Sequence, residues 1–424
     1  MTAASFAPPV ANLKPRRPAR RDRVAHLLAN LFFFCALLPF LSPLPARSDV
    51  QLPAFVVAAV IVLRDTLKGR FTVNWVEGVF IAVGIWSFCF VLPGNPFTVR
   101  ERIGILSAFM AYWVVKKHAP LFSPRVLMVA IVITLGSSLV QLGLPSLYGA
   151  VAPFFLRTVK DLSEGGRGAS GPSAEPSFLA GMALVHGLLI IYYFAAGRVE
   201  KRTFQIGVAM AAASLLISKS ATGFMYLGIL AMIGAGYYAF RGMTVGRWVA
   251  LLVSIAVLFG VVLGPLAESR GGVILVGLYQ KPDEVLADGS AQERVRCLTI
   301  GVLSMIKYPL GVGGGGFPDV ALETYKEYNL QRVFERAREV SVTGILNAGG
   351  MYFAELGIVF VFFLAIVLGA SMRIEALHLL YATLAFFFMM ISFSITFPLT
   401  WVLLGLAARK DFLAARPATI RHAA

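Results

Sequence analysis

Long apolar stretches alternate with short polar connections along most of this chain. The stretches fall at about residues 27–45, 50–64, 75–93, 102–116, 124–143, 176–196, 203–219, 221–240, 247–266, 345–369, 374–391 and 395–408. They are continuous runs of Leu, Val, Ile, Phe and Ala with small residues between them, as packed membrane helices require. A helix that crosses a bilayer core needs about 20 mostly apolar residues. The pattern therefore predicts an all-α polytopic membrane protein with about 12 transmembrane helices.

The distribution of charge predicts how the chain is oriented in the membrane. Hydrophobic residues make up 58% of the 424 positions, and the net charge is +16. Basic residues concentrate in the first 26 positions and then on alternate connections, which the positive-inside rule places in the cytoplasm. We therefore expect both termini to be cytoplasmic. Because the cations are dispersed over these connections, we do not expect the chain to bind nucleic acid.

The same pattern divides the chain into regions. Residues 1–26 form a basic cytoplasmic tail, 27–266 carry spans one to nine, 345–408 carry the last three spans, and 409–424 form a second cytoplasmic tail. Two long connections lie on the opposite, outer side, at about 144–175 and at 267–344. Long loops in a compact protein are usually functional, so these two connections are where we expect chemistry.

The first outer connection ends in a candidate catalytic carboxylate. Pro176 suits the first turn of a helix because it has no N–H to leave unsatisfied. Glu175 then lies at the positive end of that helix dipole, close in sequence to Ser177 and Arg167. Two interpretations stay open. Glu175 is either a helix cap or a carboxylate that orients or deprotonates a hydroxyl group.

The second outer connection carries a candidate cation. The spacing of apolar residues predicts an amphipathic helix over 291–308, with Arg294 near its start. Pro309 ends that helix, and the glycine-rich stretch 311–316 follows. The stretch is either a flexible turn or a nest of N–H groups for an anion, and it lacks the ending of a phosphate-binding Walker loop. A charged helix is predicted at about 319–340.

Three further residues are polar where the pattern predicts apolar surroundings. Lys219 lies in a tight outer connection, where it either snorkels or faces a phosphate group. Glu355 lies inside the span predicted at 345–369, after Asn347, and is either a binding residue or the partner of a neighbouring helix. We expect no metal site, because the three cysteines have no CxxC spacing and Glu375 and His378 lack a third ligand.

These residues together resemble the O-antigen ligase and polymerase superfamily, and within it the Wzy-type polysaccharide polymerases. One segment is Glu175-Pro176-Ser177, which opens a span after an outer loop. A second runs from Arg294 to Pro309 and continues as Leu310-Gly311-Val312-Gly313. The third runs from Asn347 to Glu355-Leu356-Gly357. The resemblance in predicted topology covers nearly the whole chain, and the three segments add to it through their order.

The chain departs from the family pattern at two positions. Leu346 stands where ligase-like members often have a histidine, which weakens the ligase interpretation. Lys219 stands where members tend to have an arginine, so the charge is kept but the planar fork of the guanidinium is lost.

The resemblance implies a GT-C-like, inverting membrane glycosyltransferase in the bacterial inner membrane. Its substrates would be undecaprenyl-pyrophosphate-linked oligosaccharides, joined at the periplasmic face into a surface or extracellular polysaccharide. It would need no cofactor, and its partners would be the lipid bilayer and a chain-length regulator or export complex. We expect Glu175 and Arg294 to be catalytic. The expected substrate- and pyrophosphate-binding residues are Arg167, Lys219, Ser177, Asn347 and Glu355.

Two alternative functions stay open at this point. One is an O-antigen ligase that transfers the glycan to lipid A–core. The other is a flippase or secondary transporter of lipid-linked oligosaccharides, although the chain lacks the paired broken segments and internal repeats that are typical of transporters.

Overall fold

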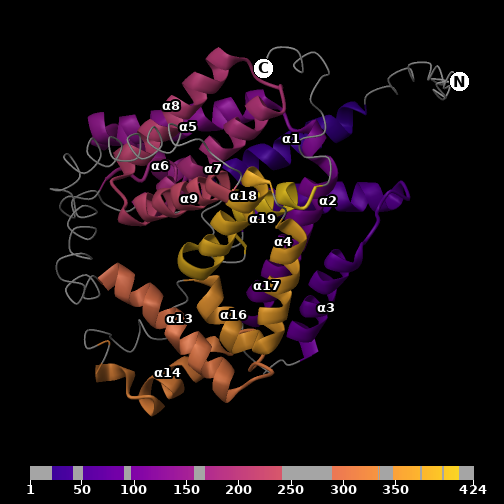
Figure 1. Cartoon of the computed structure of the whole chain (residues 1–424), viewed down its shortest axis with the longest axis vertical. Coiled ribbons are helices and arrows are strands. Elements are labelled where there is room, and N and C mark those ends of the chain that lie inside the picture. Colours follow the sequence, from indigo (N-terminus) through magenta and orange to yellow (C-terminus); the bar gives the residue numbers. More distant parts are fainter. Residues whose placement is uncertain are drawn as a thin grey trace, which may run out of the picture.

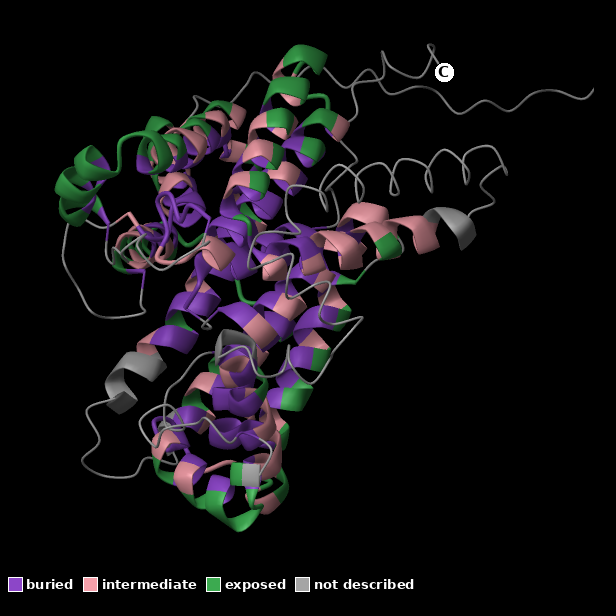
Figure 2. Cartoon of the chain, turned by 90° about the vertical axis from the view of Figure 1, so that its left-hand side faces the viewer, coloured by how far each residue is buried: buried purple, intermediate pink, exposed green. Residues whose placement is uncertain are grey.

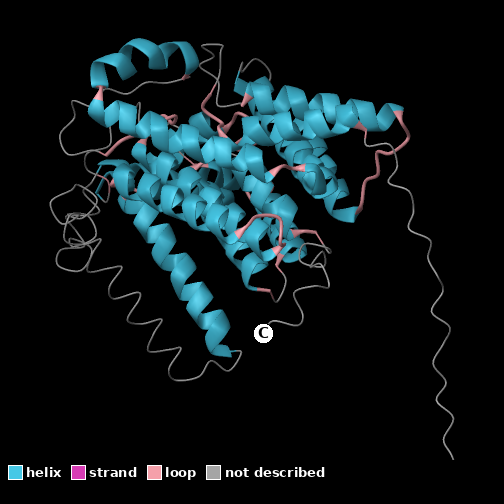
Figure 3. Cartoon of the chain, turned by 90° about the horizontal axis from the view of Figure 1, so that it is seen from above, coloured by secondary structure: helices cyan, strands magenta, loops and turns pink. Residues whose placement is uncertain are grey.

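The computed structural model describes residues 22–41, 51–89, 97–156, 168–240, 289–332, 334, 347–372, 375–393 and 396–409. In this part of the chain the regular elements are all helices, and the only extended pairing is an isolated bridge between Leu41 and Leu156 (Figure 3). The predicted all-α class is therefore confirmed for these residues. The span predicted at 247–266 lies outside them.

The first half of the described chain forms nine helices and one short 3-10 turn. Their bounds are α1 Arg23–Leu37, α2 Leu52–Leu67, α3 Trp75–Cys89, α4 Phe97–His118, the turn η1 Ala119–Leu121, α5 Pro124–Gly143, α6 Pro145–Phe155, α7 Pro176–Ala195, α8 Lys201–Ser218 and α9 Ala221–Phe240. Proline at the first turn marks the start of several of them. Ser123 also caps α5, because its side chain accepts a hydrogen bond from the N–H of Arg125.

The second half contains shorter helices. Their bounds are α13 Gly289–Lys307, α14 Phe317–Glu327, η2 Leu330–Arg332, α16 Ala348–Leu356, α17 Ile358–Ser371, α18 Ala376–Phe387, η3 Phe388–Ser392 and α19 Pro398–Ala407. The helix predicted over 291–308 is thus present as α13. The charged helix predicted at about 319–340 is present as α14, which ends earlier, at Glu327.

Two helices are long and apolar enough to cross a membrane by length and composition. They are α5 and α7, and the remaining apolar helices among the described residues are shorter. In Figure 1, α5, α8 and α9 run across the upper part of the molecule, whereas α3 and α17 run along its long vertical axis. The apolar helices therefore do not share one direction. The number of about 12 membrane spans stays a prediction.

The structure adds a helix to one predicted connection and divides one predicted span. The connection predicted at about 144–175 contains α6, whose apolar residues Leu147, Val151 and Phe154 are exposed. The span predicted as continuous over 345–369 is interrupted at Gly357, where α16 ends and α17 begins. Gly357 has φ of 58°, and a side chain there would lie 2.2 Å from the carbonyl oxygen of Pro309. Glycine is thus required by both the backbone angle and the close approach.

Helices α13 and α16 pack against each other through glycines. A Cβ atom on Gly301 would lie 2.0 Å from the carbonyl oxygen of Gly350, and one on Gly350 would lie 2.4 Å from that of Cys297. The two backbones approach this closely only because both positions lack a side chain. Buried residues fill the middle of the molecule around such contacts, and exposed residues gather toward its outer ends (Figure 2).

Candidate functional site

The segment that precedes α7 is fixed to the neighbouring helices by hydrogen bonds. The side-chain oxygen of Gln141, on α5, accepts the backbone N–H groups of Ser170 at 2.8 Å and Gly171 at 2.7 Å. The N–H of Ala169 donates to the carbonyl of Ile217 at 3.1 Å, near the end of α8. A Cβ atom on Gly168 would lie 2.1 Å from the carbonyl oxygen of Ser218, so the segment lies directly on the end of α8. These contacts hold the start of α7 in a fixed position.

Glu175 occupies the cap position of α7 but does not cap it with its side chain. The backbone carbonyl of Glu175 accepts the N–H of Phe178 at 3.0 Å, while no side-chain capping bond is formed. The carboxylate instead receives the hydroxyl of Ser177 at 3.5 Å. The side chain of Glu175 is 30% exposed, so a substrate hydroxyl would have access to it.

Arg294 brings three separate segments together. Its Nη1 donates to the hydroxyl of Thr222 at 3.0 Å, and its Nη2 donates to that of Ser177 at 3.2 Å. Nη2 also lies 3.9 Å from a carboxylate oxygen of Glu175. Since the side chain of Arg294 is only 13% exposed, its charge acts in partly desolvated surroundings, where it is worth more than in water. We call Glu175, Ser177, Thr222, Arg294 and Asn347 the Arg294 cluster.

Asn347 fixes the backbone from which the guanidinium extends. Its Nδ2 donates to the carbonyl of Arg294 at 3.0 Å, and its Oδ1 accepts the N–H of Gly350 at 2.7 Å as the cap of α16. Asn347 is almost fully buried. The two bonds of this one side chain therefore tie the start of α16 to α13 at the level of Arg294.

The starts of several helices meet at the Arg294 cluster. Ser177 is in the first turn of α7, Thr222 is in the first turn of α9, and Asn347 caps α16. The N-terminus of a helix carries a partial positive charge and N–H groups that favour anions. Together with the guanidinium, these ends suit a negatively charged group, while Glu175 supplies a carboxylate beside it. The arrangement has the parts needed to hold an anionic leaving group next to a base.

The structure does not bring every predicted site residue to this cluster. Lys219 ends α8 in a left-handed conformation with φ of 47°, and its side chain is exposed. Its ammonium group forms no hydrogen bond or ion pair with another residue that the structure describes, and its backbone N–H donates to the carbonyl of Leu216 at 3.1 Å. Arg167, the other predicted phosphate-binding cation, lies outside the described residues, as does Leu346.

Glu355 lies at the other end of α16, eight residues after Asn347 and hence about 12 Å further along the helix. It is 1% exposed, and one carboxylate oxygen accepts the N–H of Gly315 at 3.1 Å. The backbone carbonyl of Glu355 accepts the N–H of Gly313 at 3.0 Å. Glu355 therefore holds the glycine-rich turn in place, and the N–H of Gly315 is directed at this carboxylate rather than at a ligand.

Sequence reasoning missed two residues that build the site. Thr222 was treated only as part of the tight connection after Ser218, yet it binds Arg294. Gln141 was treated as part of an apolar span, yet it is fully buried and holds the segment before Glu175. A buried amide inside an apolar helix is expensive unless it is bonded, and that signal would have found Gln141.

No group of three or more His, Cys, Asp or Glu side chains is arranged to hold a metal ion within the described parts of the chain. No protein-family model matches the chain, and no curated protein matches it at a significant level. The resemblance to the polymerase superfamily therefore rests on the motifs and their order alone.

Proposed function

We propose that this protein is an inverting membrane glycosyltransferase that polymerises undecaprenyl-pyrophosphate-linked oligosaccharide units. The single observation that carries the proposal is the contact of Arg294 with Ser177, 3.2 Å away, beside the carboxylate of Glu175. The two residues are far apart in sequence, and they belong to two of the three motifs on which the family resemblance rests.

The proposed reaction needs a base and an anion-binding group in one place. The acceptor sugar hydroxyl attacks the anomeric carbon of the donor glycan, and its proton passes to the carboxylate of Glu175. The bond between the anomeric carbon and the pyrophosphate oxygen breaks, and the lipid pyrophosphate leaves with the electron pair. Arg294 and the helix starts around it stabilise the negative charge that develops on this leaving group. Ser177 and Thr222 orient the guanidinium.

A membrane location for this chemistry is supported by the exposed surface of the apolar helices. On α5, Val129, Val132, Leu139 and Leu142 are each at least half exposed. On α2, Val56, Val60 and Leu63 are exposed as well. Soluble monomers rarely expose such large apolar areas, whereas lipid covers them at no cost. In the proposed topology both termini face the cytoplasm, and a reporter fused after Ala424 is expected to be active only there.

The proposal is tested by the lipid-linked intermediates of a strain that lacks this protein. We expect single repeat units to accumulate on the lipid carrier at the periplasmic face, as sized by mass spectrometry. Accumulation of finished polymer on the carrier would instead indicate a ligase. Repeat units retained at the cytoplasmic face would indicate a flippase. Either of these results would contradict a polymerase.

A further inference from the structure

A second polar site lies at the far end of α7. A pocket of about 740 Å³ opens there, lined by residues from α1, α2, α4 and α5 and from the connections after α2 and α7. Helix α7 begins at the Arg294 cluster and ends just before Arg198, which lines this pocket. At 1.5 Å per residue its 20 residues separate the two sites by about 30 Å. The pocket is therefore not part of the proposed catalytic site.

The carboxylates that line this pocket are already neutralised. Asp22 forms ion pairs with Arg64 and, at 3.0 Å, with Lys68. The hydrogen bonds from Lys68 and from the backbone N–H of Ala25 lower the pKa of Asp22 to about 2, and the charge of Arg64 contributes less. Asp65 is buried and lies 2.9 Å from a guanidinium nitrogen of Arg64 and 3.0 Å from Nε2 of His118. These contacts leave little negative charge free on the pocket wall.

Three cations of the pocket have no carboxylate partner in the described part of the chain. They are Arg70, Lys117 and Arg198, and all three are exposed. Lys117 donates to the hydroxyl of Thr72 at 3.0 Å, and Arg198 donates to the carbonyls of Pro120 at 3.3 Å and Phe122 at 2.6 Å. These acceptors are neutral, so they orient the cations without compensating their charge. Arg198 also lies over the ring of Tyr193, with its Cζ atom 5.0 Å from the centroid.

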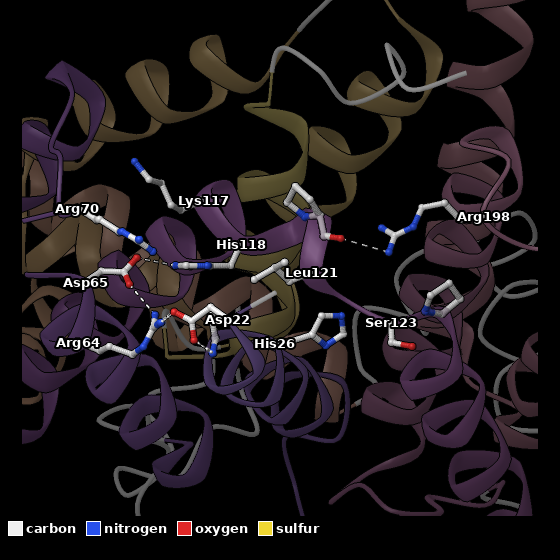
Figure 4. Close-up of a pocket in the computed structure, with 13 residues that line it drawn as sticks. Asp22, His26, Arg64, Asp65, Arg70, Lys117, His118, Leu121, Ser123 and Arg198 are labelled. Carbon is white, nitrogen blue, oxygen red and sulfur yellow. Dashed lines mark hydrogen bonds and ion pairs between the residues drawn. The ribbon is translucent and has the colours of Figure 1, made fainter. Parts of the chain in front are cut away.

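The three cations line the pocket on both sides of one turn. Figure 4 shows Arg70 and Lys117 on one side and Arg198 on the other, with the turn that carries Leu121 between them. Ser123 and Pro124, which also line the pocket, form the start of α5 and add the positive end of its dipole. In total, four permanent cations and two carboxylates line the pocket, which gives a net charge of +2 before any histidine is protonated.

We propose that this pocket binds a phosphate-bearing anion. Guanidinium and ammonium groups that no carboxylate of the described chain neutralises, with a helix start beside them, attract the oxygens of a phosphate-bearing anion. The volume admits a phosphate monoester or diester with a small attached group. A phospholipid headgroup and a soluble phosphate ester share this chemistry. A basic pocket at the end of a set of apolar helices is a recognised arrangement for anionic headgroups.

The test uses the purified full-length protein in an uncharged detergent. Binding of dihexanoyl phosphatidic acid, of inorganic phosphate and of dihexanoyl phosphatidylcholine is titrated by calorimetry. We expect saturable binding of phosphatidic acid that weakens as salt is raised. Saturable binding of inorganic phosphate as well would show that the phosphate group alone suffices. Binding of phosphatidic acid alone would identify a lipid headgroup. Phosphatidylcholine, whose choline cancels the charge, should bind far more weakly.

Charge-removing variants connect the binding to this pocket. Arg70→Gln and Lys117→Gln each remove one charged contact from an exposed side chain, and each should weaken binding about 10-fold. The double variant should weaken it about 100-fold. Lys201→Gln, at an exposed cation that does not line the pocket, should bind as the unmodified protein does. Absence of saturable binding to any phosphate probe, or an equal loss in Lys201→Gln, would overturn the proposal. Neither result depends on transferase activity.

Discussion

The two carboxylates that the sequence singled out, Glu175 and Glu355, differ in their exposure and in their hydrogen-bond partners. Glu175 is 30% exposed at the start of α7, and its carboxylate lies against the side chains of Ser177 and Arg294. Glu355 is 1% exposed near the end of α16, and it binds the backbone N–H of Gly315. A substrate can approach the first carboxylate, whereas the second is enclosed by the turn that it holds.

This difference leads us to expect different roles for the two carboxylates. A carboxylate inside an apolar segment is a functional hypothesis by default. Here a glycine-rich turn donates a backbone hydrogen bond to the buried carboxylate of Glu355, which offsets part of the cost of burying it. The carboxylate of Glu175 instead lies against side chains, and it shares the hydroxyl of Ser177 with Arg294. The same isosteric substitution should therefore reduce activity strongly at Glu175 and hardly at all at Glu355.

Glu175→Gln is expected to have the largest effect. A positioned base contributes about 10²–10⁴ in rate, so we expect no polymer from this variant and little from Glu175→Asp, whose oxygen lies further from a fixed hydroxyl. As a helix cap the carboxylate would be worth only about 0.3–1 kcal/mol. The measurement is a gel ladder made by purified protein from lipid-linked repeat units. A normal ladder from Glu175→Gln at equal abundance would assign Glu175 to the cap.

Arg294→Ala should remove about 10²–10³ in rate, because it deletes a preorganised donor at the position of developing charge. Arg294→Lys should recover little, since an ammonium group cannot bind Ser177 and Thr222 at once in the fork geometry of a guanidinium. The matched control is Arg202→Ala, an exposed arginine at the start of α8. Full-length polymer from Arg294→Ala would remove this residue from the site.

Thr222→Val is a smaller change in the same cluster. Valine keeps the shape of threonine but cannot accept the bond from Nη1 of Arg294. Because Ser177 still holds the other nitrogen, we expect a loss of about 10-fold in polymerisation rate, equivalent to about 1.4 kcal/mol. Initial rates in the same ladder assay check this. An effect as large as that of Arg294→Ala would mean that Thr222 contacts substrate directly.

Glu355→Gln should leave the rate nearly unchanged, because the amide oxygen still accepts the N–H of Gly315. Glu355→Ala removes that acceptor and leaves a buried donor unsatisfied, which costs about 1–3 kcal/mol of stability. We expect a lower thermal midpoint and a lower yield for Glu355→Ala, with normal rate per folded molecule. Loss of activity in a stable Glu355→Gln protein would show that Glu355 takes part in the reaction. The two carboxylates would then not differ in role.

Much of the helical arrangement could be predicted from the sequence because its boundaries carry strong signals. Pro124 and Pro176 start α5 and α7 at the predicted positions, and α13 lies within two residues of its predicted bounds. The errors have physical causes. Helix α6 was not predicted, although Pro145 occupies its first turn and the helix accommodates Pro153. The break at Gly357 depends on a contact with Pro309, which is distant in sequence.

The site was predictable only in part, for a related reason. Residue type and position suggested Glu175, Ser177, Arg294 and Asn347, and the structure brings these together. Thr222 was missed because its partner Arg294 is distant in sequence. Asn347 itself does cap α16, and its second bond to Arg294 depends on how α13 and α16 pack. Local sequence patterns do not predict how two helices pack against each other.

The close packing of α13 on α16 limits where residues can be inserted into the chain. The glycine contacts at Gly301 and Gly350, and the bond from Ile358 to Pro309, hold both helices in one register. One residue inserted between Arg294 and Gly301 would rotate Arg294 by about 100° away from Ser177. Insertions after Glu327, beyond these contacts, would leave the register intact. Natural length differences among homologues should therefore gather between the two helices and avoid their interiors.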